Sequence, residues 1–221
     1  MEFEQYFFNK KYINSNWQME PGEKAAMLYI LNNINSEISI EIGTSHGGSL
    51  RPISDFSQKV YSFDLDHNYI SKLDYDNVEF ITGNSKKSLP KIIKELNKSI
   101  KALEFVLIDG DHSKPGVKKD IENILEYKPK KPLYILMHDS FHPNCRSGIL
   151  EANWNKSPYV HFVEVDFVHG TFHQIENFYK EMWGGFSLAL LLPKKRTSKL
   201  SISQSQELMF KSMLKSSVHN F

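Results

Sequence analysis

The sequence predicts an α/β protein built on a seven-stranded, mostly parallel sheet with helices on both faces. Three observations predict it. Short apolar runs alternate along the chain with amphipathic helical segments, the runs are apolar throughout, and glycine or ionisable residues gather directly after them. The chain has 221 residues, 40% of them hydrophobic, so it is long enough to bury the core of one such domain.

Three helices are expected from apolar residues that recur at the spacing of one helical face. The first covers residues 24–35. The other two carry apolar stripes within residues 89–96 and 117–125. The residues that form the three stripes are Met27, Ile30, Leu31 and Ile34, then Leu89, Ile92, Ile93 and Leu96, then Val117, Ile121, Ile124 and Leu125.

The apolar runs between these helices predict the strands. Alternation of buried strand and helix implies parallel pairing with right-handed crossovers. The last two runs follow each other without a clear long helix between them, which favours an antiparallel hairpin at one edge of the sheet. The seven runs are residues 38–42, 60–63, 78–81, 103–108, 133–137, 160–165 and 186–192.

Composition and charge exclude several classes of function. The chain has 27 Lys and Arg against 26 Asp and Glu, so no net field favours nucleic acid. Its single cysteine, Cys145, cannot close an internal disulfide, which predicts a cytoplasmic protein. No apolar run approaches the roughly 20 residues of a membrane span, and the amino terminus has no long apolar run either. Neither secretion nor a membrane partner is therefore expected.

The last part of the chain is more basic than the rest. Residues 194–221 hold six basic residues and only Glu207 as an acid. We expect a single domain over residues 1–193, with an amino-terminal helical segment, followed by a basic carboxyl-terminal tail that is partly helical around Phe210, Met213 and Leu214. A solvated tail is one interpretation. Contact with an anionic substrate or with a second copy of the chain is the other, so the oligomeric state stays open.

A glycine-rich turn follows the first apolar run in the segment EIGTSHGGS. Glycines let the backbone turn sharply and approach a ligand closely. The spacings G-x-G-x-x-G and G-K-[ST] are absent, so a ligand without phosphate fits better. Asp64 ends the second run, where an acid commonly binds ribose hydroxyls. Asn84 and Ser85 follow the third run, either as ligand contacts or as an ordinary turn.

Acids and histidines follow the fourth and fifth runs, in the segments DGDHS and MHDSFH. Adjacent parallel strands bring these ends together, and their carboxylates could hold Mg²⁺ or a similar hard cation. Such a cation lowers the pKa of a bound hydroxyl, and a histidine could remove its proton. Alternatively, the acids cap helices or pair with Lys118 and Lys119. The residues concerned are Asp109, Asp111, His112, His138, Asp139 and His142.

These motifs resemble the class I S-adenosylmethionine-dependent methyltransferases, most of all the branch of macrocin-type sugar O-methyltransferases and cephalosporin hydroxylase-like proteins. The resemblance covers residues 38–193. Its most specific part is DGDHS before a helix that carries Asp120. It implies a Rossmann-like sheet of strand order 3-2-1-4-5-7-6.

The resemblance also implies roles for individual residues. Asp64 would bind the ribose of the cofactor, and Asn84 and Ser85 would lie near the adenine. The metal ligands would be Asp109, His138 and Asp139, and the general base His112. His138 stands where the family has an acid, and imidazole suits Zn, Fe, Mn or Ni better than Mg. The implied cofactor-binding residues are Glu41, Gly43, Thr44, Ser45, Gly47, Ser49, Asp64, Asn84, Ser85 and Asp109.

The predicted function is transfer of a methyl group from S-adenosylmethionine to a hydroxyl of a sugar or other small molecule, assisted by a divalent metal ion. Acceptor contacts are expected from the amino-terminal segment, including Trp17, and from residues 167–183, which carry His169, His173 and Tyr179. These side chains could equally be packed in the core. Two alternatives remain. One is a metal hydrolase or oxygenase that uses Asp109, His138, Asp139 and His142, and the other is a nucleoside-binding module without turnover.

Overall fold

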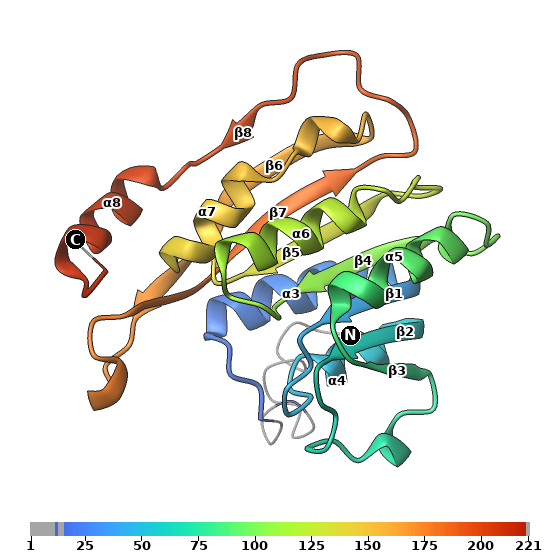
Figure 1. Ribbon diagram of the computed structural model, residues 1–221, viewed down its shortest axis with the longest axis horizontal. Helices are drawn as coiled ribbons and strands as arrows, with labels where there is room; N and C mark the ends of the chain where they lie inside the picture. Colours follow the sequence, from blue (N-terminus) through green and yellow to red (C-terminus); the bar gives the residue numbers. More distant parts are fainter. Residues whose placement is uncertain (1–11, 13–15, 220–221) are drawn as a thin grey trace.

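An eight-stranded sheet runs through the molecule in the order β3-β2-β1-β4-β5-β7-β6-β8 (Figure 1). The computed structural model describes residue 12 and residues 16–219. The strands are β1 (Ser36–Ile42), β2 (Ser57–Asp64), β3 (Val78–Thr82), β4 (Leu103–Ile108), β5 (Leu133–His138), β6 (Val160–Phe172), β7 (Met182–Leu191) and β8 (Ile202–Ser203).

The predicted strand order is confirmed. β1 pairs in parallel with both β2 and β4, and β3 and β5 extend the parallel part on either side. β7 runs antiparallel to β5 and to β6, as the two last apolar runs predict. The predicted count of seven strands is wrong, because β8 pairs in parallel with β6. A strand of two residues in a polar segment is too short to produce any periodicity in the sequence.

Helices cover both faces of the sheet (Figure 1). One core cluster joins α5, α6 and α7 to the sheet, and a second joins α3 and α4 to the opposite face. β4 contributes to both, with Val106 in the first and Phe105 in the second. The helices are α3 (Pro21–Ile34), α4 (Leu50–Asp55), α5 (Ser85–Leu96), α6 (Lys114–Ile124), α7 (Pro143–Glu151) and α8 (Glu207–Ser216), with short 3₁₀ turns η1 (Lys72–Asp74), η2 (Trp154–Lys156) and η3 (Glu176–Phe178).

Local signals at the helix starts position the loops that follow the strands. Asn84 caps α5 by accepting the backbone N–H of Lys86, and Ser113 caps α6 by accepting that of Gly116. α3 begins three residues before the predicted start, because Pro21 occupies its first turn, where proline is favoured. This earlier start places Glu23 inside the helix.

The carboxyl-terminal segment folds back onto the domain. The helix expected around Phe210 is α8, and Phe210 packs with Phe141 and Met182 in a third apolar cluster. A solvated tail is therefore wrong for the residues of β8 and α8. Among the described helices, none is both long and apolar enough to cross a membrane.

Candidate functional site

A cavity of about 1200 Å³ opens at the carboxyl ends of the parallel strands. The ends of β1 to β5 line it on the sheet side, and the segment before α3 and the hairpin of β6 and β7 line it on the other. In an open α/β sheet a crevice forms where the strand order reverses, here between β1 and β4. The cavity therefore lies where such a fold binds its ligands.

The turn after β1 approaches its neighbours so closely that two positions require glycine. Gly43 has φ +91°, and a Cβ there would lie 1.9 Å from the backbone oxygen of Asp109. A Cβ on Gly48 would lie 2.3 Å from Cα of Trp17. The turn is thus packed between the end of β4 and Trp17, which is buried and lines the cavity. Both contacts shape the cavity wall.

Asp64 holds this turn in place from the end of β2. Its Oδ2 accepts the backbone N–H groups of Thr44 and Ser45 at 2.7 and 2.8 Å. Burial raises the pKa of Asp64, but hydrogen bonds from Ser45, Asp66 and Thr44 outweigh it, so the pKa is lowered overall. Asp64 lines the cavity as a carboxylate. Gly43, Thr44, Ser45 and Ser49 line it as well, as the resemblance implies.

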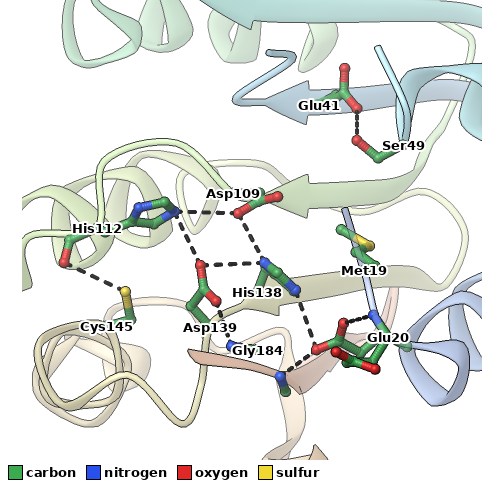
Figure 2. Close-up of polar contacts among 12 residues, drawn as sticks. Met19, Glu20, Glu41, Ser49, Asp109, His112, His138, Asp139, Cys145 and Gly184 are labelled. Carbon is green, nitrogen blue, oxygen red and sulfur yellow. Dashed lines mark hydrogen bonds and ion pairs between the residues drawn. The ribbon is translucent and has the colours of Figure 1, made fainter. Parts of the chain in front are cut away.

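Glu41 lies beneath the turn and does not line the cavity. Its side chain is fully buried, and it accepts a hydrogen bond from the hydroxyl of Ser49 at 2.7 Å (Figure 2). It accepts a second one from the hydroxyl of Ser62 at 3.2 Å. Burial raises its pKa to about 8. Gly47 does not line the cavity either. The structure thus gives Glu41 a supporting contact, through Ser49, in place of the direct cofactor contact that the resemblance implies.

Asn84 and Ser85 line the cavity at the start of α5. The hydroxyl of Ser85 donates to Asp120 Oδ1 at 2.9 Å, and burial raises the pKa of Asp120 to about 6. Lys86, a lining residue that the sequence analysis missed, pairs with Asp111 at 2.8 Å. The lysine that pairs with an acid of the DGDHS segment is therefore Lys86, and not Lys118 or Lys119, which the alternative interpretation named.

The acids and histidines predicted after β4 and β5 do come together (Figure 2). His138 Nδ1 lies 3.1 Å from Asp109 Oδ1 and 3.3 Å from Asp139 Oδ2. His112 Nε2 lies 3.1 Å from Asp139 Oδ2 and 3.5 Å from Asp109 Oδ1. One ligand atom each from Asp109, His138 and Asp139 lies within 4.8 Å of the others, so the three could hold a metal ion. Two carboxylates and one imidazole suit a divalent cation.

Asp139 owes its position to an unusual backbone. Its φ is +56°, in the left-handed region, which non-glycine residues adopt mainly where the surroundings hold them there. Its Oδ1 accepts the backbone N–H of Gly184 at 2.7 Å. Burial raises the pKa of Asp139, but the positive charge of His138 outweighs this and lowers it. The β7 backbone thus fixes the carboxylate against the two imidazoles.

The carboxylates of the cluster raise the pKa of its two histidines. A hydrogen bond to Asp109 raises the pKa of His112, against the effect of burial. Burial lowers the pKa of His138, but Asp139 and Asp109 together outweigh it and raise the pKa well above its ordinary value. The neighbouring carboxylates therefore raise the pKa of both imidazoles, and most of all that of His138.

Several residues outside the parallel strand ends complete the site. Trp183 lines the cavity and packs against the ring of His112, with centroids 5.3 Å apart. His142 lies behind Trp183, with ring centroids 4.4 Å apart, and does not line the cavity. Its expected role as a ligand in a hydrolase or oxygenase site has no support in this placement. Of the expected acceptor contacts, Trp17 and His173 line the cavity, whereas His169 and Tyr179 do not.

The sequence analysis also missed Glu23. This acid of α3 is 1% exposed, lines the cavity, and its Oε1 lies 3.3 Å from His138 Nε2. Proline followed two residues later by an acid is a signal for the first turn of a helix. That signal could have placed Glu23 in α3, but it says nothing of the contact with His138.

Comparisons with known proteins agree with this geometry. The family described as "Methyltransferase domain" matches residues 40–140. An O-methyltransferase from Bacillus cereus, solved with S-adenosylhomocysteine (SAH), is 17% identical over 86% of this chain and 90% of its own, with a TM-score of 0.56. An rRNA methylase from Streptococcus thermophilus is 14% identical over 80% of this chain and 99% of its own, with a TM-score of 0.51.

A third similar structure is the MycE methyltransferase of the mycinamycin biosynthetic pathway, in complex with Mg, SAH and mycinamycin VI. It is 15% identical over 90% of this chain and 55% of its own, with a TM-score of 0.51. No curated protein matches the sequence. The methyltransferase family model therefore matches residues 40–140, and the chain has the fold of these solved methyltransferases, as the sequence resemblance implies.

Proposed function

We propose that the protein is an S-adenosylmethionine-dependent O-methyltransferase that methylates a hydroxyl of a sugar or another small molecule with the help of a divalent metal ion. One observation carries the proposal. His112 and the group formed by Asp109, His138 and Asp139 line the same cavity as the glycine-rich turn and Asp64. A methyl donor and an activated hydroxyl could therefore meet in one enclosed space.

The sheet side of the cavity suits the cofactor. S-adenosylmethionine, when bound, supplies a methyl group on a positively charged sulfur. The turn around Gly43 would hold its methionine part, Asp64 its ribose hydroxyls, and Asn84 and Ser85 its adenine. A Cβ on Gly43 or Gly48 would collide with backbone atoms, so these glycines keep the wall of the cradle open.

Asp109, His138 and Asp139 would hold the metal ion, and their mutual spacing fits such a site. A bound divalent cation would polarise the acceptor hydroxyl and lower its pKa. The two carboxylates come from different strand ends and are each fixed by further contacts, Asp139 by Gly184 and Asp109 by His138.

His112 would accept the proton of the acceptor hydroxyl. Its side chain is 41% exposed within a site whose other members are mostly buried, and it lines the cavity. Asp109 and Asp139 orient its Nε2, and the edge of Trp183 packs against its ring. These contacts hold the imidazole in one position, as a general base requires.

The acceptor would lie between the segment before α3 and the β6–β7 hairpin. Trp17, Ile175, Phe178 and Trp183 line this side. Such side chains suit the apolar face of a sugar ring or another small organic molecule.

The proposal is tested by calorimetric titration with S-adenosylmethionine and SAH, followed by reaction with methyl-labelled cofactor. We expect both compounds to bind, and mass spectrometry to find the label on a hydroxyl of one compound in a metabolite and glycan extract. Failure of both to bind would contradict the proposal. Binding with no transfer to any acceptor would instead indicate a nucleoside-binding module.

A further inference from the structure

The two ring nitrogens of His138 face different parts of the molecule. Nδ1 faces Asp109 and Asp139, at 3.1 and 3.3 Å. Nε2 faces Glu23 Oε1 at 3.3 Å. Within the described residues Nε2 has no hydrogen bond of full geometry, and the carboxylate of Glu23 is the acceptor that faces it. The ring also packs edge-on against Phe186, with centroids 5.3 Å apart.

Glu23 is itself held firmly on the far side of the ring. Its Oε2 accepts the backbone N–H of Glu20 at 2.6 Å, and its Oε1 accepts that of Gly185. Gly184 has φ +72°, and a Cβ there would lie 2.8 Å from Glu23 Oε1. A buried carboxylate is costly unless donors surround it, and here two backbone donors and an imidazole do so. The carboxylate therefore occupies a space that Gly184 leaves open for it.

Gly184 and Gly185 also help to position a residue of the candidate metal site. Gly184 donates its backbone N–H to Asp139 Oδ1, and the next residue, Gly185, donates to Glu23. One short stretch of β7 thus fixes a candidate metal ligand and the carboxylate behind His138 together. A carboxylate that accepts the second N–H of a metal-bound imidazole sets its tautomer and orientation.

We propose that Glu23 is a positioning residue for the metal site: it accepts the Nε2 proton of His138 in a hydrogen bond and leaves Nδ1 to donate its lone pair to the cation. The inference rests on the metal part of the proposed function. It gives α3, which lies outside the matched methyltransferase domain, a direct part in building the site.

The test compares metal binding in three full-length proteins. Mn²⁺ and Zn²⁺ affinities are measured by calorimetry for the wild type, for Glu23→Gln, and for Glu104→Gln. Glu104 is a matched control, because it is also a buried acid that accepts a backbone N–H, from Glu37 at 2.9 Å, but on a part of β4 that does not line the cavity. We expect Glu23→Gln to weaken metal binding about 10- to 100-fold. Glu104→Gln should bind metal as the wild type does, and SAH affinity should be the same in all three.

A second measurement needs no variant of Glu23. Nitrogen-15 NMR of histidine-labelled, metal-loaded wild type reports which ring nitrogen of His138 keeps its proton, with His138→Gln to assign the signal. We expect the proton on Nε2. Metal binding through Nε2, or equal metal affinity in Glu23→Gln and the wild type, would overturn the inference alone. A wild type that binds neither ion would overturn it together with the metal part of the proposed function, while SAH binding would still test the methyltransferase.

Discussion

The contacts of His112 fix the orientation of its imidazole, which suits the proposed role of general base. Its Nε2 lies between the carboxylates of Asp109 and Asp139, and its ring packs against Trp183. We predict that His112→Ala lowers kcat by about 10² to 10⁴, the usual contribution of a general base. SAH affinity and metal content should not change. Loss of metal from the variant would make His112 a ligand, and an unchanged rate would leave it a structural residue.

Asp64 has two roles to separate, since it lines the cavity and also accepts the N–H groups of Thr44 and Ser45. We predict that Asp64→Ala weakens SAH binding by about 1 to 3 kcal/mol, the cost of losing charge-assisted hydrogen bonds. Calorimetry measures this, with Asp66→Ala as the control, because among the described residues the side chain of Asp66 accepts hydrogen bonds only from the nearby Asn68. Equal affinity in Asp64→Ala and the wild type would remove Asp64 from the cofactor site.

At the residue level, the sequence could identify groups whose position follows from the sheet alone. Asp109 and the pair His138 and Asp139 follow adjacent parallel strands, so their meeting is a consequence of topology. Glu23 reaches the same site from a helix, and its hydrogen bond from Gly185 joins residues 162 positions apart. The packing of α3 against the sheet creates that contact, so no local sequence pattern predicts it.

At the level of elements, the turn after β1 rests on the buried carboxyl of Glu41, whose pKa is raised from 4.5 to about 8. Between these two values the unfolded chain has lost the proton that the folded protein retains. Stability should therefore fall as the pH rises from about 4.5 to about 8, and Glu41 should add no further dependence outside that window.

We predict that Glu41→Gln makes stability less dependent on pH between 5 and 8, because the amide is neutral throughout and can keep contacts with Ser49 and Ser62. Urea unfolding across this range compares the variant with the wild type. The same slope in both proteins would show that Glu41 is ionised in the folded state, contrary to this interpretation.

The carboxyl-terminal segment is fastened by a buried ion pair between α7 and β6. Arg146 Nη1 lies 2.5 Å from Asp166 Oδ1, and both side chains are nearly inaccessible. Arg146 also donates to Gln204 at 3.0 Å, and its guanidinium lies 4.1 Å from the ring centroid of Phe210. Asp166 accepts the backbone N–H of Gln206 at 2.9 Å. One ion pair thus holds both the link to α8 and α8 itself.

We predict that Arg146→Met destabilises the protein by about 3 to 5 kcal/mol, because it leaves the carboxylate of Asp166 buried without its cation. Urea unfolding measures the loss, and hydrogen exchange should show faster exchange in β8 and α8. The control is Lys211→Met, whose ion pair with Glu207 lies at the surface, so that its loss should have little effect on stability. Equal stability of the two variants would contradict the role given to the buried pair.

The accuracy of the strand boundaries predicted from the sequence depends on how each strand is buried. β4 matches the predicted run 103–108, because every residue in it is buried and apolar character marks both ends. β6 continues to Phe172, beyond the predicted end at residue 165, through a register shift between Glu164 and Val168. Past that irregularity buried and exposed positions no longer alternate regularly, so the sequence shows no strand pattern there.

For the whole molecule, the two sides of the cavity come from different parts of the chain. The matched domain, residues 40–140, supplies the glycine-rich turn, Asp64 and the Asp and His group. Trp17, Glu23, His173 and Trp183 lie outside it and form the other side. The sequence motifs belong to the first side, which is why they predicted cofactor and metal residues. The second side depends on how α3 and the β6–β7 hairpin pack over the strand ends. The sequence predicted Trp17 and His173 there, but not Glu23.

This division predicts that chelation separates cofactor binding from turnover. In the proposed function Asp109, His138 and Asp139 would act on the acceptor hydroxyl through the metal ion, whereas the glycine-rich turn and Asp64 would bind the cofactor. Exhaustive treatment with EDTA should abolish methyl transfer and leave SAH affinity nearly intact. SAH at 100 times its Kd should still stabilise the protein by about 2.7 kcal/mol, measured as a shift in Tm.

Adding back Mg²⁺, Mn²⁺, Zn²⁺ or Ni²⁺ should then restore the rate. Because His138 supplies an imidazole nitrogen among the ligands, an ion that accepts nitrogen readily should restore more activity than Mg²⁺ does. Transfer that survives complete removal of metal would contradict the metal site and leave His112 to activate the hydroxyl without it.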